Sequence, residues 1–396
     1  MGEHDFDCVI DRTQTPALKH HKIVLGEDGA GLFAAGVADM DFRVAPCIIE
    51  AIEKRAAHGV FGYETVPDGL LPALTGWAQS RHGWTVDPAH ILRAPNVLNA
   101  LAMAANLFTE KGDGIIIQPP VFFDFADIIA ENGRTLIENP LVLRKGRFEM
   151  DFDGLEAAAS APRTRMLLLC NPHNPVGRVW TRAELARLAD ICRRNGVLVV
   201  ADEIHGDLVF RGHRYTPFAS LSAEDALNSV TCLSPAKSFN IAACACAFTL
   251  VPDPVRRAAF KAENSRLTVN KNNAFASVAM EAAYERGGPW LDDAIAYLEG
   301  NVALLRERLR QIPGVTMIEP EGTFLVWLDF RELEPESEAL TRFLRHKARW
   351  AVTRGIAFGP QGAGFARLNI ACPRARLIEA LDRLERAAQD HMESTK

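Results

Sequence analysis

Short apolar runs alternate with amphipathic stretches through the middle of the chain. The apolar runs, which predict buried strands, are 114–118, 135–137, 166–170, 197–201 and 230–233. Helical spacing of hydrophobic residues appears at 125–132 and 181–195. Thr181 with Glu184 is the signature of a capping box at the start of the second helix, and Gly196 ends that helix. This order predicts an α/β domain with a mostly parallel sheet covered on both faces.

The pattern changes near residue 287. The candidate helices beyond it are 290–311, 338–350 and 376–391, and the candidate strands are 315–317, 323–330 and 365–370. Strands and helices now no longer alternate regularly, which is typical of an α+β unit. We therefore expect a large domain over 47–286, a smaller α+β domain over 287–396, and an N-terminal segment, 1–46, that packs with the small domain.

Composition limits the classes of protein that remain. The 396 residues are 48% hydrophobic and 24% charged, as in ordinary soluble globular proteins. The formal net charge of −6 argues against nucleic acid or an anionic membrane as the main partner. The longest apolar run, 241–251, is shorter than the roughly 18 residues of a membrane span. Eight cysteines without a CxxC pair and an acidic start without the features of a secretory signal predict a cytoplasmic protein.

Two short segments carry weaker signals. Residues 22–25 read as a strand, and the following 29–34 spell GxGxxA, which leaves nicotinamide or flavin binding open as an alternative. Cys244 and Cys246 form a CxC in an apolar run, and we expect a strand there with both sulfurs on one buried side.

Polar residues stand where three of the predicted strands end. Asn171, Asp202 and Ser234 each follow or close an apolar run. The carboxyl ends of parallel strands meet at one edge of a sheet, and ligands of such sheets bind at that edge. The sequence therefore predicts a ligand site that contains these three residues.

Lys237 lies just after the last of these strands. A lysine between small residues at the end of a buried strand is placed to lose its hydration and to form an imine with an aldehyde. The alternative interpretation is a solvated surface lysine.

Asp202 closes an apolar strand, where its charge is costly unless it meets a cation. A pyridinium N–H is such a cation, and a carboxylate beside it keeps the ring an electron sink. A helix N-cap or a salt bridge is the alternative. His205 is close enough along the chain to reach the same ligand. Asp202, Glu203, His205 and Asp207 could instead bind a metal, but no second cluster of ligands supports that, and we predict no metal.

Three more elements have the chemistry of a ligand site. Two Asn-Pro dipeptides hold Asn174 in a fixed turn, where its amide can donate a hydrogen bond. The alternative is that the prolines only shape an ordinary loop. The backbone N–H groups of Val97 and Leu98 open an apolar helix and could bind phosphate, the alternative being an ordinary helix start. Arg367 interrupts an apolar strand and suits a substrate carboxylate, unless it lies on an exposed edge.

Together these elements resemble one family, the fold-type I pyridoxal-phosphate enzymes of the aminotransferase class I/II superfamily. Within it the chain is most similar to the cystathionine β-lyase (C–S lyase) branch, which includes proteins of the maltose-regulon-modulator type. The stretches that carry the resemblance are 37–42, 61–63, 171–178, 202–205, 237–240, 367–369 and 372–374. The resemblance covers nearly the whole chain and implies a large domain with a mostly parallel, seven-stranded sheet between helices.

The resemblance also implies a role for each site residue and pyridoxal 5′-phosphate as the cofactor. Lys237 forms the imine with the cofactor and later moves protons, and Asp202 pairs with the pyridine nitrogen. Asn174 and His205 lie near the phenolic oxygen, and Phe122 stacks on the ring. Ser234, Val97 and Leu98 hold the phosphate, together with Tyr63 from the neighbouring subunit of a homodimer. Arg367 takes the substrate carboxylate, helped by the backbone near Ala38.

Four positions depart from the branch pattern. The branch usually has Trp at Gly36, Tyr at Phe122, Gly at Ala243 and Tyr at Phe324. The departures at Gly36, Phe122 and Phe324 predict a substrate pocket that is less polar, and roomier beside Gly36, than is usual.

The resulting hypothesis is a pyridoxal-phosphate-dependent C–S β-lyase that cleaves an L-cysteine S-conjugate such as cystathionine to thiol, pyruvate and ammonia. An aminotransferase of an L-amino acid is the nearest alternative. A regulatory protein that keeps the cofactor and contacts a partner is a third hypothesis, against which the net charge weighs.

Overall fold

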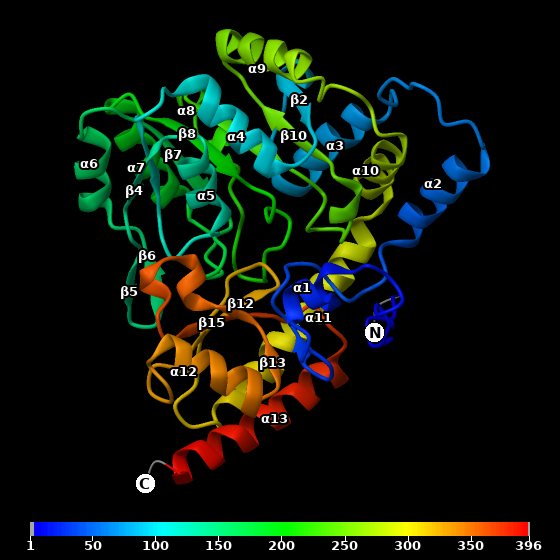
Figure 1. Ribbon diagram of the computed structural model, residues 1–396. Helices are drawn as coiled ribbons and strands as arrows, with labels where there is room; N and C mark the ends of the chain where they lie inside the picture. Colours follow the sequence, from blue (N-terminus) through cyan, green and yellow to red (C-terminus); the bar gives the residue numbers. More distant parts are fainter. Residues whose placement is uncertain (1–3, 395–396) are drawn as a thin grey trace.

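The computed structural model describes residues 4–394. A seven-stranded sheet forms the core of the larger part of the protein (Figure 1). In spatial order its strands are β2 (Ile91–Ala94), β10 (Ala247–Leu250), β9 (Ser229–Leu233), β8 (Leu198–Asp202), β7 (Thr164–Cys170), β3 (Gly114–Ile117) and β4 (Thr135–Glu138). Only β10 is antiparallel to its neighbours in this sheet. The predicted α/β fold with a mostly parallel sheet is confirmed.

Helices cover both faces of the sheet because alternate strand residues point to opposite sides. Ile115 and Ile117 of β3 join one core cluster and Ile116 joins the other. The first cluster includes residues of α4 (Val97–Phe108), α5 (Asp124–Glu131) and α9 (Pro254–Arg266), and the second includes residues of α6 (Phe152–Ser160) and α7 (Arg182–Arg194). The capping box predicted at the start of α7 is present, with Thr181 as its N-cap.

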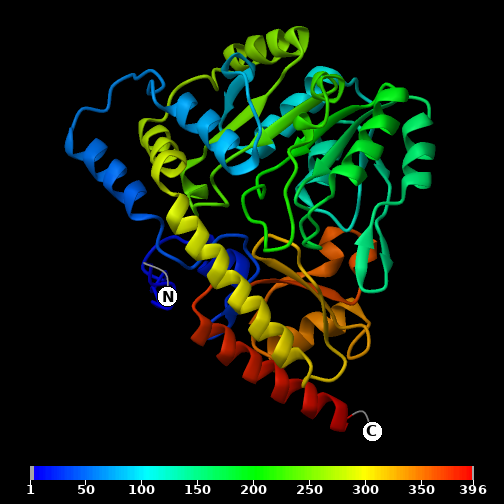
Figure 2. The same ribbon diagram turned by 180° about the vertical axis from the view of Figure 1, so that it is seen from behind.

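The remaining elements of the large part are α2 (Pro46–Ala57), α3 (Leu70–His82), α8 (Ala223–Leu227), α10 (Ala274–Arg286) and the hairpin of β5 (Val142–Arg144) and β6 (Arg147–Glu149). The long helix α11 (Gly288–Leu309) then leads from this part to a second sheet (Figure 2).

The second sheet has four antiparallel strands in the order β11-β12-β15-β14. They are β11 (Thr316–Ile318), β12 (Leu325–Asp329), β15 (Phe365–Asn369) and β14 (Thr353–Arg354), packed with α12 (Ser337–Arg342) and α13 (Arg374–Ser394). The N-terminal segment joins this part, because β1 (Phe33–Ala34) pairs with β13 (Trp350–Ala351). The order of strands and helices agrees with the predicted α+β character of this region.

Several local predictions were wrong. Residues Lys22–Leu25 form a helix, α1, so the Gly29–Ala34 stretch lacks the strand-then-helix context that dinucleotide binding requires. Cys244 ends a short 3-10 helix and Ala245 is left-handed, so no strand contains the CxC pair. The expected helix 338–350 is interrupted after Arg342 by a π-helical turn, Phe343–Lys347, before β13.

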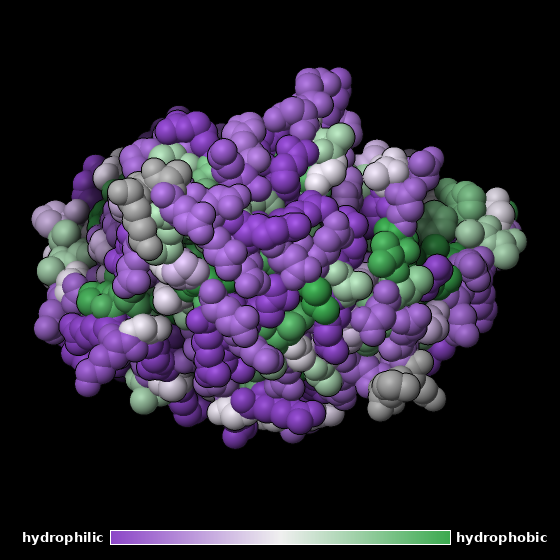
Figure 3. Space-filling model, turned by 90° about the horizontal axis from the view of Figure 1, so that it is seen from below, coloured by the Kyte–Doolittle hydropathy of each residue, from purple (hydrophilic) through white to green (hydrophobic). Residues whose placement is uncertain are grey.

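The surface seen from below is mostly hydrophilic, with small and separated apolar patches (Figure 3). Within residues 4–394, no helix is both long enough and apolar enough to cross a membrane.

A buried arginine fixes the 171–178 loop at the end of β7 to the segment before β12. The Arg178 side chain is 1% exposed, and its Nε lies 2.9 Å from Glu321 Oε2. The same carboxylate oxygen accepts from the backbone N–H of Val179 at 2.8 Å. A second arginine, Arg147, reaches Glu321 Oε1 at 2.9 Å from a half-exposed position. The two sheets therefore meet at a shared carboxylate next to the loop that carries Asn174.

Backbone carbonyls 36–40, which follow β1, accept hydrogen bonds from side chains far away in the sequence. Arg367 and Thr353 donate to the Gly36 carbonyl, and Asn369 donates to the Val37 carbonyl. Lys237 donates to the Ala38 carbonyl. Asn369 and Lys19 donate to the Asp39 carbonyl, and Asn240 and Arg12 donate to the Met40 carbonyl. We call residues 36–40 the carbonyl segment. It belongs to the N-terminal segment and connects residues 12–19 of that segment with the loop after β9 and with β15.

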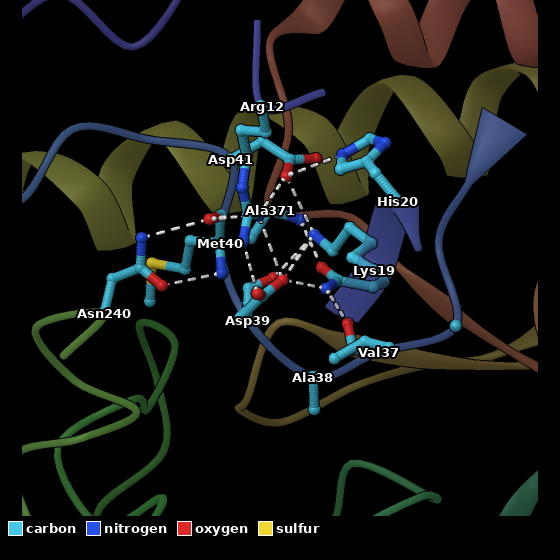
Figure 4. Close-up of polar contacts among 12 residues, drawn as sticks. Arg12, Lys19, His20, Val37, Ala38, Asp39, Met40, Asp41, Asn240 and Ala371 are labelled. Atoms are coloured by element: carbon cyan, nitrogen blue, oxygen red, sulfur yellow. Dashed lines mark hydrogen bonds and ion pairs between the residues drawn. The ribbon is translucent and has the colours of Figure 1, made fainter. Parts of the chain in front are cut away.

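Two acids in and beside the carbonyl segment bind it to residues 12–20, nearer the start of the N-terminal segment (Figure 4). Arg12 lies 2.6 Å from both Asp39 Oδ2 and Asp41 Oδ1. Lys19, whose side chain is 1% exposed, lies 2.9 Å from Asp39 and 3.1 Å from Asp41. Burial alone would raise the pKa of Asp41, but the hydrogen bond from His20 and the charge of Lys19 lower it to about 2. The cluster is thus a set of compensated buried charges.

The first prediction concerns Arg178. We expect Arg178→Met to lower the free energy of unfolding by about 3 kcal/mol, because it removes a buried cation that both Glu321 and Glu184 contact. Arg147→Met removes a half-exposed arginine from the same carboxylate and should cost much less. Urea unfolding of both variants measures the difference, and equal losses would contradict this interpretation.

The second prediction concerns Lys19. We expect Lys19→Met to lower the free energy of unfolding by about 3 kcal/mol, since Asp39 and Asp41 then share one cation instead of two. Lys22→Met is the matched control, because Lys22 makes only an exposed ion pair with Glu27. Urea titrations near pH 7 test both variants. A loss for Lys19→Met no larger than that of the control would disprove the role of the buried pair.

Candidate functional site

A cavity of about 540 Å³ lies between the two sheets. Lys237 and Phe122 line it from the large part of the protein, Gly36 and Ala38 from the carbonyl segment, and Arg367 from β15. A volume in this range suits a small organic ligand. The cavity lies beyond the carboxyl ends of the parallel strands, where the sequence placed the site.

Lys237 follows β9 and reaches into this cavity. Its ammonium group donates to the carbonyl oxygen of Ala38 at 2.7 Å. Burial, together with the positive charge of Arg367, lowers the pKa of Lys237 to about 8. The amine is therefore much easier to deprotonate than that of a solvated lysine, and this environment excludes the surface-lysine interpretation.

Asp202 is the last residue of β8 and is buried. Its Oδ1 accepts from the backbone N–H of Ile204 at 3.1 Å. Burial raises the pKa of Asp202 to about 6, while the hydrogen bond from Ile204 and the nearby charge of Lys237 act in the opposite direction. Because burial disfavours the ionised form of Asp202, a cation bound against the carboxylate would stabilise that form.

The other acids near Asp202 already accept hydrogen bonds from neighbouring residues. Glu203 accepts from Asn171, Tyr215 and the backbone N–H of Phe218. Asp207 accepts from Trp77 and Ser238 and contacts His82. In the part of the chain that the structure describes, no group of three or more His, Cys, Asp or Glu side chains could hold a metal ion.

His205 and Asn171 carry polar atoms that are buried without a hydrogen-bond partner among residues 4–394. These atoms are His205 Nδ1 and Asn171 Oδ1. Burial, reinforced by the charges of Lys237 and Arg367, lowers the pKa of His205 to about 3, so its imidazole is neutral at pH 7. Because His205 feels the charges of Lys237 and Arg367, it lies near the cavity, and its free Nδ1 is available to a polar ligand there.

Arg367 lies on β15 between β12 and β14 and is buried, which excludes an exposed edge position. Its Nη1 donates to Asn174 Oδ1 at 3.0 Å and its Nη2 donates to the Gly36 carbonyl at 2.6 Å. Burial lowers the pKa of its guanidinium to about 9, which leaves it charged at pH 7. Its Nε has no partner among the described residues. The cation is thus positioned by neutral groups and available to an anion.

Not all of the other predicted site residues line this cavity, and Val97, Leu98 and Ser234 do not occur among the described residues of its wall. Phe122 lines the cavity with its ring 4.9 Å from that of Phe123. Val97 and Leu98 form the first turn of α4, whose N-cap is Asn96. The hydroxyl of Ser234 donates to the Cys246 carbonyl and accepts from the Ala236 N–H. Tyr63, in contrast, is fully exposed on the loop between α2 and α3, away from the other residues of this chain's site.

Sequence reasoning missed the residues that support the carbonyl segment. Asn369, Asn240, Lys19 and Arg12 donate to it, and only long-range contacts bring them there. The signal that could have found the two cations is the pair Asp39 and Asp41, since two acids beside an apolar stretch need positive partners.

Comparisons with known proteins agree with this geometry. The family model "Aminotransferase class I and II" matches residues 32–384. The chain is 44% identical over 352 residues to cystathionine beta-lyase PatB of Bacillus subtilis (strain 168). The matched region covers 89% of this chain and 91% of that protein. The chain is 34% identical over 376 residues to protein MalY of Escherichia coli (strain K12), with 94% and 96% covered.

A solved structure extends the likeness to three dimensions. Cystalysin from Treponema denticola, whose crystal structure contains a pyridoxal 5′-phosphate cofactor, matches with a TM-score of 0.94 and 32% identity, covering 98% of this chain and 99% of that chain. The chain therefore belongs to the aminotransferase class I and II family.

Proposed function

We propose that the protein is a pyridoxal-phosphate-dependent carbon–sulfur β-lyase that cleaves an L-cysteine S-conjugate, such as cystathionine, to a thiol, pyruvate and ammonia. The observation that carries the proposal is that one cavity contains both a lysine of lowered pKa, Lys237, and a buried arginine, Arg367, that can bind a carboxylate. The similarity to a cystathionine beta-lyase over most of both chains supports the choice of reaction.

The residues present fit pyridoxal phosphate. A carboxylate of raised pKa, Asp202, suits a pyridinium N–H. The partnerless Nδ1 of His205 and the amide of Asn174 suit a phenolic oxygen, and the ring of Phe122 offers a stacking face. The first turn of α4, at Val97 and Leu98, and the neighbouring Ser234 suit a phosphate group.

When bound, the cofactor supplies a ring that accepts the electron pair released at the substrate Cα. The chain's own part begins with Arg367, which binds the α-carboxylate with help from the backbone at Ala38. This contact orients the Cα–H bond toward Lys237. The free amine of Lys237 then removes the Cα proton as a general base. The Cβ–S bond breaks, the thiolate leaves, and hydrolysis of the remaining enamine gives pyruvate and ammonia.

The assembly belongs to the same proposal. Val60, Phe61 and Tyr63 are exposed on one loop, and a second copy of the chain would cover them and receive Tyr63 at its phosphate site. We therefore propose a homodimer with shared sites. A cytoplasmic location is supported by the eight free cysteines, most of which are buried. The division into 1–46, 47–286 and 287–396 is supported by the helices that begin at Pro46 and Gly288.

The third prediction tests the reaction. Purified holoenzyme mixed with L-cystathionine or S-methyl-L-cysteine should release pyruvate and thiol in equal amounts, with no 2-oxo acid added. Lys237→Ala removes the general base and should reduce the rate by at least about a thousandfold. Coupled pyruvate and thiol assays measure both products. Strict dependence on an added 2-oxo acid, with the amino group transferred to it, would show an aminotransferase instead.

The fourth prediction concerns pH. Only the neutral amine of Lys237 attacks an aldehyde, so uptake of pyridoxal phosphate by the apoprotein should accelerate as pH rises through about 8. Arg367→Met removes a nearby positive charge and should move this midpoint to higher pH, because the charged lysine is then less disfavoured. Arg354→Met is the control, since Arg354 lines the cavity but pairs with Glu338. Stopped-flow absorbance of the bound cofactor gives the midpoints, and an unchanged one in Arg367→Met would refute the coupling.

A further inference from the structure

The cavity continues past Lys237 and Arg367 into an apolar region, which we call the outer lobe. Its walls come from the N-terminal segment, α12, the π-helical turn, β13 and the short 3-10 helix that follows β14. The wall residues are Leu18, Val24, Leu340, Leu344, Trp350 and Ile356. The wall of the outer lobe is thus mainly apolar, with Ser337, Thr341, Arg345 and Arg354 as polar residues among the hydrocarbon side chains.

The charges of the cavity favour an uncharged ligand in the outer lobe. None of the described residues that line it is Asp or Glu. The two outer arginines are already paired, Arg345 with Asp28 and Arg354 with Glu338 at 3.0 Å. A distal ammonium group, such as that of cystathionine, would lose hydration in the lobe without gaining a carboxylate. An apolar group would instead be removed from water at no electrostatic cost.

Gly36 adds room to the cavity beside Arg367. Its carbonyl accepts from Arg367, yet the residue itself contributes no side chain to the wall. A Cβ built there would meet Ala351 and Thr353 only at ordinary contact distances of 3.5 Å, so the glycine is not required by crowding. Gly36 therefore adds no side-chain bulk to the cavity wall beside Arg367.

We propose that the preferred substrates are L-cysteine conjugates whose sulfur carries a bulky apolar group, and that the outer lobe binds this group. The inference rests on the proposed lyase function and names its substrate class. Arg367 holds the carboxylate at the inner end, Lys237 faces Cα, and the sulfur substituent extends between Val24, Leu340 and Leu344.

A substrate series tests the proposal on the holoenzyme. We expect kcat/KM to rise from S-methyl- through S-propyl- to S-hexyl-L-cysteine, by up to about fourfold for each methylene that the lobe buries. S-benzyl-L-cysteine should also be preferred over L-cystathionine. Pyruvate release measures every substrate in the same assay.

Two variants that each introduce a glutamate, one inside the outer lobe and one just outside it, test whether the lobe binds the substituent. Val24 and Ile23 are neighbours on α1, 40% and 79% exposed, and only Val24 lines the cavity. Val24→Glu should lower kcat/KM for S-hexyl-L-cysteine by about tenfold or more and leave S-methyl-L-cysteine nearly unaffected. Ile23→Glu should change neither. Both sites are exposed, and equal thermal unfolding temperatures confirm that the variants are folded.

A binding measurement supplements the kinetics. Calorimetric titration of Lys237→Ala with S-hexyl- and S-methyl-L-cysteine should show the same preference without turnover, and Val24→Glu added to that variant should abolish it. Cleavage of S-methyl-L-cysteine and cystathionine as fast as of the hexyl conjugate would overturn the substrate class and leave the lyase standing. Failure to cleave any conjugate would overturn the lyase function and this inference with it.

Discussion

The hydrogen bonding of backbone carbonyls 36–40 is the constraint on which the site depends. An unpaired buried carbonyl is costly, and this segment lacks the strand partners that would satisfy it. Side-chain donors take their place, and two of them, Lys237 and Arg367, are the cations of the cavity. Each cation obtains an acceptor and the segment obtains donors, so these contacts position the cations and satisfy the carbonyls together.

The same arrangement explains the protonation states of the site. The donors of Lys237 and Arg367 meet neutral carbonyl and amide oxygens, so their charges are positioned but not neutralised. Burial lowers the pKa of Lys237, and the repulsion between the two charges in one cavity lowers it further. Neutral partners therefore keep the lysine amine easy to deprotonate and the arginine available to an anion, whereas a carboxylate partner would have opposed both effects.

The strand-end residues could be predicted from the sequence because local patterns determine them. Apolar runs mark β7, β8 and β9, and parallel strands must end at a common edge, so Asn171, Asp202 and Ser234 follow directly. The reading of Lys22–Leu25 as a strand failed because four residues carry too little periodicity to separate a strand from a helical turn. The CxC prediction failed because the left-handed Ala245 ends pairing there, which an apolar run does not reveal.

The supporting residues escaped prediction for a different reason. Lys19, Asn240 and Asn369 are polar residues without a local signal, and each acts on the carbonyl segment across a long stretch of chain. Only the fold shows that they act together. The resemblance covers Asn240, Asn369 and residues 37–42, but it does not show that these residues contact one another, and it does not cover Lys19.

The two sheets divide the work of the site in a way that bears on the choice of reaction. The edge of the large sheet presents the lysine, the buried aspartate and the neutral imidazole, which suit the removal of the Cα proton that elimination and amino transfer both require. The small sheet and the N-terminal segment decide what else is bound. An acceptor with two carboxylates needs a second available cation beyond Arg367. The outer arginines of the cavity, Arg345 and Arg354, are already committed to Asp28 and Glu338. Of the described residues that line the cavity, only Lys237 and Arg367 are buried cations, and this supports the proposed elimination over amino transfer to a dicarboxylic acceptor.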